Sequence, residues 1–331
     1  MQASNELIQQ IIKLQNSLLT EAEKKILQDL IIAYESIENE LRVFVSKYGI
    51  KGVMPEAAKV AQYNRLNNLL TSLEENINNI LKRIDYQLQK STVLGYQQLY
   101  YQYMYTNSMT AGLNLYFGIV NETTILAAIN YPLSKLANSK LLANARAETI
   151  EKIKQAIKQG IIRGESVDNV SANIARLLGL FQTQVGQLVG IDAGKLYQLQ
   201  RVARTEMMRI FNQAAVDEML KSNEMGLKTR LQLLSTIDDR TRPQSAQMDG
   251  QISNEKGEFK YPDGSYYKIG QTGNPAWDIN DRETTVPYLG EIMGETRKKF
   301  GKIDDYETFS EYAKRNNINF NKYGQELYTK S

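Results

Sequence analysis

The sequence predicts a mainly α-helical chain with an N-terminal antiparallel helical hairpin and a small α+β module toward the C-terminus. Apolar residues recur every three or four positions through much of the chain up to Gly226, as in helices that pack on one face. After Gly226 the pattern changes to strand-like apolar segments and closely spaced turn residues. We expect a helical region at 1–146, the α+β module at 147–290 and a polar tail at 291–331.

The composition of the 331 residues narrows the function classes. There are 40 basic and 37 acidic residues, so the formal net charge of +3 favours neither nucleic acid nor an anionic membrane as a partner. No apolar run approaches the roughly 20 residues of a membrane span, and the segment MQASNELIQQ lacks the features of a signal peptide. We therefore expect a cytosolic protein, or a component of a particle assembled in the cytosol, with no membrane partner.

Histidine and cysteine are both absent from the sequence. Disulfides, thiolate nucleophiles, sulfur-bound zinc and histidine-dependent triads are thereby excluded. Any catalysis would rest on carboxylate, amine, guanidinium or hydroxyl groups. We identify no catalytic motif, no metal site and no cofactor, and we predict that the protein is not an enzyme.

The N-terminal region predicts a helical hairpin at 21–88. Residues 21–48 and 57–88 each repeat apolar positions in alternating steps of three and four, which is the seam of a coiled coil. We expect two antiparallel helices in contact; two helices packed on a broader core are the alternative. A shorter helix should precede them from Ser4, and a new helix should start at Thr20, where TEAE fits a capping box.

A tyrosine-rich segment, GYQQLYYQYMYTNS, follows at 95–108. Tyrosines at helical spacing suit packing, a protein interface or a stacking surface for single-stranded nucleic acid. Only Lys90 lies nearby in the sequence, so the basic residues that attract nucleic acid are missing. We therefore favour packing or a protein contact over nucleic acid. The candidate partner-binding residues are Tyr96, Tyr100, Tyr101, Tyr103 and Tyr105.

Three helices lead into the strands of the module. They are predicted at 147–167, 166–179 and 190–226, and each ends near a glycine. Strand-like apolar content begins at Leu227, and two turn clusters within 254–270 predict a β-hairpin. In the polar tail we expect one helix and an extended arm.

The densest group of charged, hydroxyl and turn residues is TIDDRTRPQSAQMDGQ at 236–251, which we call the polar loop. A catalytic loop, a metal site and a structural cluster are the alternatives for it. Aspartate and threonine side chains close backbone turns, and proline fixes the next φ angle. Arginine offers a planar group with several donors for carboxylates or carbonyls. We expect Arg240 or Arg242 to bind Glu206 or Asp249.

The last long helix carries the segment RVARTEMMRIFNQAA. Arg204 and Glu206 lie two positions apart, about 200° around a helix, so they do not share a partner directly. Glu206 and Arg209 are three positions apart and are able to pair. Asn212 is a poor helix former that nothing local requires, so we expect it to reach into a neighbouring loop, for which the polar loop is the candidate, and to bind backbone groups there.

The helix with ARTE and its later asparagine, the segment DDRTRPQSAQMDGQ, a glycine-rich hairpin and GNPAWDINDRETTVPY together resemble the Mu F-like head-morphogenesis family of tailed phages. The resemblance covers roughly residues 147–288. It implies a structural minor head protein, located in the virion near the portal and in the host cytoplasm during assembly. It also implies a part in head morphogenesis and in genome packaging or ejection. The implied partners are the portal protein and a capsid or scaffold protein, with packaged DNA as a further candidate.

Two departures from the family pattern bear on metal binding. Ser245 stands where the family usually has a histidine, and Asn280-Asp281-Arg282-Glu283 stands where it usually has Asn-Cys-Arg-Cys. A histidine with two cysteines would suit a soft metal, and this sequence has none of them. Asp281 and Glu283 leave a hard cation open, although acids beside an arginine more often form ion pairs.

We therefore interpret the polar loop as a structural cluster that ties the ARTE helix to the NDRE segment. The residues assigned to this structural motif are Arg204, Glu206, Asn212, Asp239, Arg240, Thr241, Arg242, Asp249, Gly250, Asn280 and Arg282. One alternative function is a nucleotide-modifying or ADP-ribosyl-transferring enzyme that uses Arg204, Glu206 and Arg240. A second is a DNA-binding accessory protein of the virion.

Overall fold

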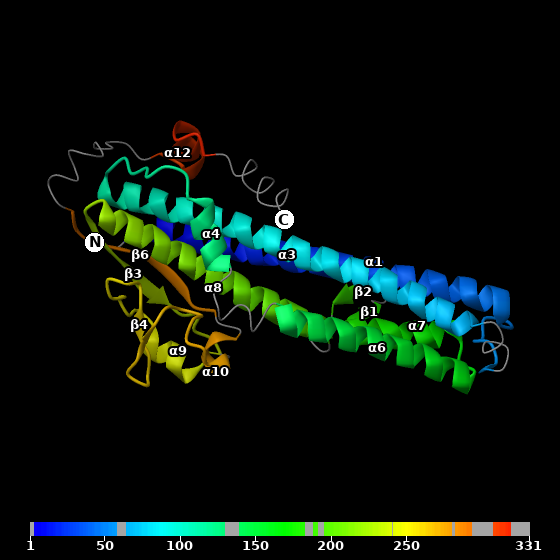
Figure 1. Cartoon of the computed structure of the whole chain (residues 1–331). Helices are drawn as coiled ribbons and strands as arrows, with labels where there is room; N and C mark the ends of the chain where they lie inside the picture. Colours follow the sequence, from blue (N-terminus) through cyan, green and yellow to red (C-terminus); the bar gives the residue numbers. More distant parts are fainter. Residues whose placement is uncertain are drawn as a thin grey trace. The chain divides into compact units, whose positions relative to one another are not determined.

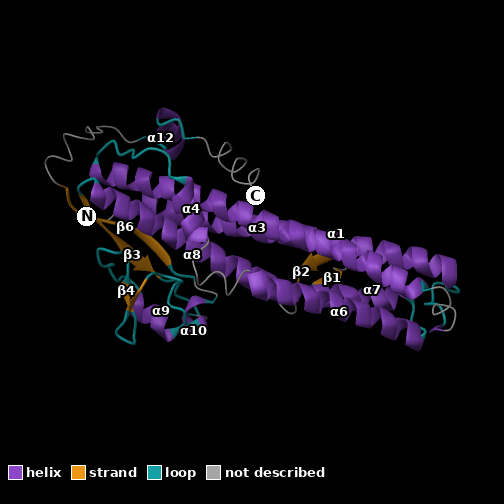
Figure 2. Cartoon of the chain, viewed as in Figure 1, coloured by secondary structure: helices purple, strands orange, loops and turns teal. Residues whose placement is uncertain are grey.

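The computed structural model describes residues 3–57, 64–129, 139–182, 188–190, 195–239, 241–279, 282–292 and 307–318. In chain order the elements are α1 (Asn5–Tyr48), α3 (Arg65–Ala111), α4 (Glu122–Ile129), α6 (Ser139–Arg163), α7 (Val167–Leu178), β1 (Leu180–Gln182), β2 (Leu188–Gly190), α8 (Lys195–Glu224), β3 (Leu227–Leu234), α9 (Pro243–Met248), β4 (Phe259–Lys260), β5 (Tyr266–Tyr267), α10 (Pro275–Asp278), β6 (Thr284–Ile292) and α12 (Phe309–Arg315) (Figure 1). The strands form antiparallel pairs β1–β2, β3–β6 and β4–β5 (Figure 2). The predicted fold class, mainly α with a small α+β module, is confirmed. Among the described helices, none combines the length and the apolar character that a bilayer crossing needs.

Contacts divide the chain into two compact units, to which α1 and α3 both contribute. The sheet unit consists of Met1–Thr20, Lys90–Ser134 and Arg204–Ser331, and the hairpin unit consists of Glu21–Gln89 and Lys135–Ala203. The predicted domains 1–146, 147–290 and 291–331 are consecutive segments defined by sequence patterns, whereas the two units combine separate segments. The three domains therefore stay a prediction.

In the hairpin unit, α1 and α3 run antiparallel. Arg83 Nη2 lies 2.6 Å from Asp29 Oδ1, and Asn76 donates a hydrogen bond to Glu40. Residue numbers along α3 therefore fall as those along α1 rise, and the predicted hairpin is confirmed. The buried residues of the seam include Leu30, Ile37, Leu41, Leu73, Ile77 and Ile84.

The helix starts predicted within the first 20 residues need one correction. Ser4 Oγ accepts a hydrogen bond from Leu7 N at 3.4 Å, in keeping with a start there. The start predicted at Thr20 is wrong, because α1 continues through it as one helix. No glycine or proline interrupts residues 5–48, so the backbone hydrogen bonds continue through TEAE.

Helices α6 and α7 pack on this hairpin. Lys154 of α6 pairs with Glu74 of α3, and Arg42 of α1 lies 2.8 Å from Asp168 of α7. The isoleucine stripe that the sequence predicts along α6 is buried. It consists of Ile150, Ile153, Ile157 and Ile161.

The ends of these helices follow the predicted signals. Ser166 caps α7, since its Oγ accepts from Asn169 N at 3.2 Å, and Gly179 ends α7 with a φ of 77°. Helix α8 ends at Glu224, and Gly226 follows with a φ of 96°. Both glycines adopt the left-handed backbone that side chains disfavour.

In the sheet unit, β3 pairs with β6 along nearly its whole length, from Leu227↔Ile292 to Leu234↔Thr284. Residues 250–253 cover the other edge of β3, where Ser253 N donates to Leu231 O. Leu231 lies opposite Pro287, so the backbone nitrogen of Pro287 points away from β3 as well, to the outer edge of β6. Proline has no N–H to donate there, and an edge position tolerates it.

Helices α3 and α8 approach each other closely at Gly95. A β-carbon at this position would lie 2.4 Å from Phe211 Cε1, which is closer than packed atoms come. Phe211 is fully buried, as is Leu99 one turn along α3. The glycine thus sets the distance at which the polar side chains of the two helices meet.

Candidate functional site

The polar loop folds back on itself through Thr241. Its Oγ1 donates to Thr236 O at 2.6 Å and accepts from Asp238 N at 2.6 Å, and its N donates to Asp238 O at 3.0 Å. Asp239, inside this turn, is exposed. This is the turn chemistry that the sequence predicts. Arg240 and Asn280 lie outside the described residues.

Arg242 binds the end of a short helix. Its guanidinium donates to the carbonyls of Trp277 and Ile279, each at 3.2 Å, and also to that of Ala276. These carbonyls lie in α10 and just after it, where backbone acceptors have no partner within the helix. Arginine supplies the missing donors, as basic residues commonly do at helix C-termini.

Of the bond predicted from Arg240 or Arg242 to Glu206 or Asp249, the Arg242 half is wrong, and the Arg240 half lies outside the described residues. Glu206 is bound at 3.0 Å by Arg209, one turn away on α8. Asp249 Oδ1 accepts from Ser235 N at 2.7 Å, just beyond the end of β3. Each carboxylate has a donor close by, and Arg242 binds open carbonyls instead.

The second predicted turn, at Asp249 and Gly250, is present. Gly250 has a φ of 77° and donates through its N to Leu233 O at 2.9 Å. The turn leads the chain from α9 back along the edge of β3. Ser245, at the position where the family pattern has histidine, is buried in α9.

A charged contact joins the polar loop to the start of β6. Arg282 Nη1 and Nη2 lie 2.6 and 2.8 Å from the two carboxylate oxygens of Asp238. The hydrogen bonds to Asp238 raise the pKa of the Arg282 guanidinium. Both side chains are partly exposed, at 27% and 35%, so we assign the pair about 1 kcal/mol or less. Asp281, which the sequence leaves open as a ligand of a hard cation together with Glu283, lies outside the described residues.

On α8, a buried ion pair faces α4. Arg209 and Glu206 are 3% and 5% exposed, and Arg209 Nη1 also donates to Ala128 O at 2.9 Å. The pairing of Glu206 with Arg209 is the one that the helical spacing predicts. Arg204 is half-buried on the same helix. Because Glu206 is enclosed and charge-paired, it is not placed to meet a substrate.

Asn212 binds the outer edge of β6. Its Nδ2 donates to Glu283 O at 3.1 Å, and its Oδ1 accepts from Thr285 N at 3.2 Å and from Thr285 Oγ1 at 3.1 Å. All three residues are buried. Asn212 thus binds backbone groups of another segment, as expected, but that segment is the start of β6 rather than the polar loop.

The tyrosines proposed for a partner surface are instead buried within the chain. Tyr96, Tyr100, Tyr101, Tyr103 and Tyr105 are each at most 5% exposed. Packing, one of the alternatives for this segment, therefore accounts for them. Their hydroxyls bind intramolecular partners: Tyr96 donates to Asp217 Oδ2 at 2.5 Å, Tyr103 donates to Thr285 O at 2.5 Å, and Tyr101 accepts from Val120 N at 2.9 Å.

Two neighbouring acidic residues of α8, Asp217 and Glu218, bind side chains of α3. Glu218 accepts from Asn107 Nδ2 at 2.7 Å and from Ser222 Oγ at 2.8 Å. Burial raises the pKa of Glu218 to about 7, against the lowering effect of these two donors. Burial also raises the pKa of Asp217, and the bond from Tyr96 lowers it.

A sequence signal for this buried contact does exist. Phe211, Ala215, Glu218 and Ser222 are spaced by four, three and four residues, so Glu218 falls on the apolar stripe of α8. Tyr96, Tyr100, Tyr103 and Asn107 have the same spacing on α3. Polar residues on two facing stripes predict a buried hydrogen bond.

Together, the side chains of the polar loop, of α8 and of the start of β6 are suited to holding segments of the sheet unit in fixed positions. Arg242, Arg282 and Asn212 each bind a different segment of the same unit, and their partners are mostly backbone groups or single carboxylates. Within the described part of the chain, no group of three or more acidic side chains is gathered as a metal site requires.

This chain is similar to one protein family over part of its length and to two individual proteins over about three quarters of its length. Residues 151–279 match the family Phage Mu protein F like protein. The chain is 25% identical over 254 residues to Minor head protein GP7 of Bacillus phage SPP1, a match that covers 76% of this chain and 77% of that protein. It is 27% identical over 254 residues to an NAD(+)–arginine ADP-ribosyltransferase of Enterococcus faecalis, covering 74% of this chain and 49% of that protein. The chain thus spans about half the length of the transferase. No solved structure matches the chain.

Proposed function

Over residues 151–279 this chain belongs to the Mu F-like family, and we propose that it is a minor head protein, a structural component of a phage virion. The observation that carries the proposal is the similarity to the SPP1 minor head protein, which covers about three quarters of both chains. Residues 151–331 are too few to contain 254 aligned residues, so the similarity extends into the helices before residue 151.

The geometry of the polar loop supports a structural role. Its described side chains join the loop to α10, to β6 and to the end of β3, which fixes the shape of the module. A component of a particle needs a surface of constant shape, because its contacts repeat in every assembled copy. We expect the loop to serve assembly by holding that shape.

We propose further that the protein associates with the portal inside the capsid and contributes to head morphogenesis, with genome packaging or ejection as later steps. The candidate contact surface is a cleft of about 410 Å³ in the hairpin unit, between the end of α1 and the end of α6. Ile50, Val53 and Ile162 line it and are 62%, 37% and 75% exposed. Exposed apolar groups that lie together in this way are typical of protein contacts.

An ADP-ribosyl-transferring enzyme is the alternative, because one relative bears that name. Two observations weigh against it. That relative is matched over only about half its length, and Glu206, the carboxylate considered for this chemistry, is 4% exposed and ion-paired.

Assembly in the presence of the chain tests the proposal. The protein is expressed together with portal, scaffold and capsid proteins of a tailed phage that encodes it, and proheads are separated by sedimentation. We expect the chain to sediment with portal-containing proheads. Absence of the chain from such proheads, together with transfer of label from NAD(+) to an arginine substrate, would establish the enzyme instead.

A surface variant tests the cleft. Ile162→Asp places a charge among exposed apolar groups and should reduce incorporation into proheads without changing the melting temperature. Ile119→Asp, an exposed isoleucine of the sheet unit at 49%, is the matched control and should be incorporated normally. Equal incorporation of both variants would remove the cleft from the contact surface.

A further inference from the structure

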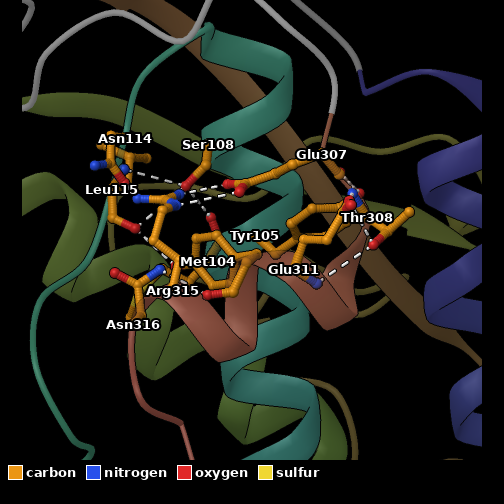
Figure 3. A network of polar contacts seen from close by, with 11 residues as sticks. Met104, Tyr105, Ser108, Asn114, Leu115, Glu307, Thr308, Glu311, Arg315 and Asn316 are labelled. Carbon is orange, nitrogen blue, oxygen red and sulfur yellow. Dashed lines mark hydrogen bonds and ion pairs between the residues drawn. The ribbon is translucent and has the colours of Figure 1, made fainter.

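Helix α12 packs on the end of α3 through a buried tyrosine, Tyr312. Figure 3 shows polar residues around this contact, among them Tyr105, Glu307 and Arg315. Tyr312 is fully buried, and its hydroxyl donates to Leu115 O at 2.7 Å. Its ring centroid lies 5.5 Å from that of Tyr105 in an edge-to-face arrangement, and Phe309 packs on Tyr105 at 5.6 Å. Edge-to-face aromatic pairs of this kind add attraction beyond the buried area.

Polar groups surround this aromatic contact. Tyr105 donates through its hydroxyl to Glu307 O at 2.6 Å, which fixes the chain two residues before α12. Arg315 binds both the Glu307 carboxylate and Asn114, and its guanidinium carbon lies 5.5 Å from the centre of the Tyr312 ring. The seat therefore recognises aromatic rings, a backbone carbonyl and a guanidinium at defined positions. We call the three residues that make these contacts, Tyr105, Asn114 and Leu115, the socket.

The helix that fills the socket has little stability of its own. Helix α12 spans 7 residues, and helices shorter than about 12–15 residues are marginal in water. The capping box between Thr308 and Glu311 satisfies its first N–H groups, but the remaining support comes from the socket. Helix α12 thus behaves as a short aromatic peptide that is bound by the rest of the chain.

The number of residues between β6 and α12 sets an upper limit on their separation. From residue 293 to residue 308 there are 16 residues, and any chain of that length spans at most roughly 50–60 Å. That limit does not prevent α12 from binding the socket of a neighbouring copy, as in domain swapping. Binding of α12 to the socket of its own chain is favoured because both are at a high effective concentration in one chain. A high concentration of neighbouring copies offsets this advantage.

We propose that the socket is a recognition site for a helical segment of the pattern Phe-x-x-Tyr-x-x-Arg, filled by α12 of the same chain and exchangeable with α12 of a second copy. The proposal stands whether or not the protein is a virion component, since it rests on the contacts of α3 and α12 alone.

Peptide binding tests the recognition. A labelled peptide with the sequence of residues 307–318 is titrated against the full chain and against its Tyr312→Ala variant, whose own α12 cannot fill the socket. We expect the variant to bind the peptide at least tenfold more tightly than the wild type, whose socket is occupied. A peptide with Tyr312→Ala should lose binding, and one with Lys314→Ala, an exposed position, should keep it. Absence of binding to the Tyr312→Ala chain, or equal binding of the two altered peptides, overturns the recognition site.

Mixing of two tagged chains tests the exchange with the socket and α12 intact. Two differently tagged wild-type chains are mixed at high concentration, and one tag is captured. We expect the second tag to be captured well above the level seen when both chains carry Tyr312→Ala, which removes the buried ring. Lys314→Ala in both chains, at an exposed position, is the matched control and should capture as much as the wild type. Equal capture of the second tag by wild-type and Tyr312→Ala chains overturns the exchange.

Discussion

At Asn212, a single side-chain amide binds the outer edge of β6, beside which the described residues place no further strand. Both its oxygen and its nitrogen are used, on Thr285 and on Glu283 O. A buried backbone group without a partner costs about 1–3 kcal/mol, which makes such an amide hard to replace.

We predict that Asn212→Ala lowers the free energy of unfolding by about 2–5 kcal/mol, because at least two buried groups of β6 lose their partner. Chemical denaturation followed by circular dichroism measures the change. Asn169→Ala, at an exposed position of α7, is the control and should change the stability by about 0.5 kcal/mol or less. A loss at Asn212 no larger than that of the control would contradict the assigned role.

Glu218 predicts a pH dependence. Its pKa is raised from the ordinary glutamate value of 4.5 to about 7 in the folded protein, so the folded state binds the proton more tightly than the unfolded state. The stability from this group is complete below about pH 4.5 and is lost as the pH rises through about 7. The raised pKa of Asp217 gives a slope of the same sign.

Glu218→Gln should therefore flatten part of the stability profile between pH 5 and 7, since the amide keeps a neutral partner for Asn107 and Ser222 at every pH. Unfolding free energies measured across that range check this. Glu255→Gln alters a side chain that is 85% exposed and should leave the slope unchanged. A slope in Glu218→Gln as steep as in the wild type would rule out Glu218 as its source.

At the scale of elements, the sequence predicts helix ends well but does not predict contacts between distant segments. Ser166 and Gly179 mark the two ends of α7 as predicted, because a cap needs only residues within one turn. TEAE failed at Thr20 because a capping-box pattern is equally compatible with a helix interior. The partner of Arg242 was missed because α10, a helix of 4 residues, leaves no apolar period in the sequence.

The prediction that the tyrosines of residues 95–108 bind a partner protein was wrong for a different reason, and packing, the other favoured alternative, was right. A tyrosine-rich helix surface predicts an interface without saying whether the other side is the same chain. Here α8, β6 and Glu307 each bind one of the tyrosines of α3. These partners lie more than 100 residues away in the sequence, beyond the reach of any local pattern.

Arg242→Ala should loosen α10 without unfolding the module. The bonds to the carbonyls are partly exposed, so we expect a loss of about 1 kcal/mol. The emission of Trp277, the single tryptophan of the chain, should shift because its own carbonyl loses the guanidinium. Arg176→Ala on α7 is the control. A drop of more than about 3 kcal/mol would mean that Arg242 compensates a buried charge.

At the scale of the whole molecule, α1 and α3 supply residues to both compact units without a break. A helix that melts in its middle leaves new ends with unpaired backbone groups. We therefore expect the two units to unfold together.

Ile157→Ala tests this cooperativity, because Ile157 is fully buried in the hairpin unit and Trp277 reports on the sheet unit. Loss of the buried side chain should cost about 2–5 kcal/mol. The denaturation midpoint seen by Trp277 should fall together with that seen by circular dichroism. Ile162→Ala, at a side chain that is 75% exposed, is the control. An unchanged tryptophan midpoint in Ile157→Ala would show that the units unfold independently.

The outer edge of β6 has a consequence for crowded conditions. Pro287 offers no N–H there, the N–H of Thr285 is held by Asn212, and the carbonyl of Thr285 is held by Tyr103. An incoming strand thus finds no free N–H at Thr285 or Pro287, and the Thr285 carbonyl is already bound. Strand addition is therefore disfavoured at this edge, so copies of the chain that crowd together are directed to contacts other than fibre growth.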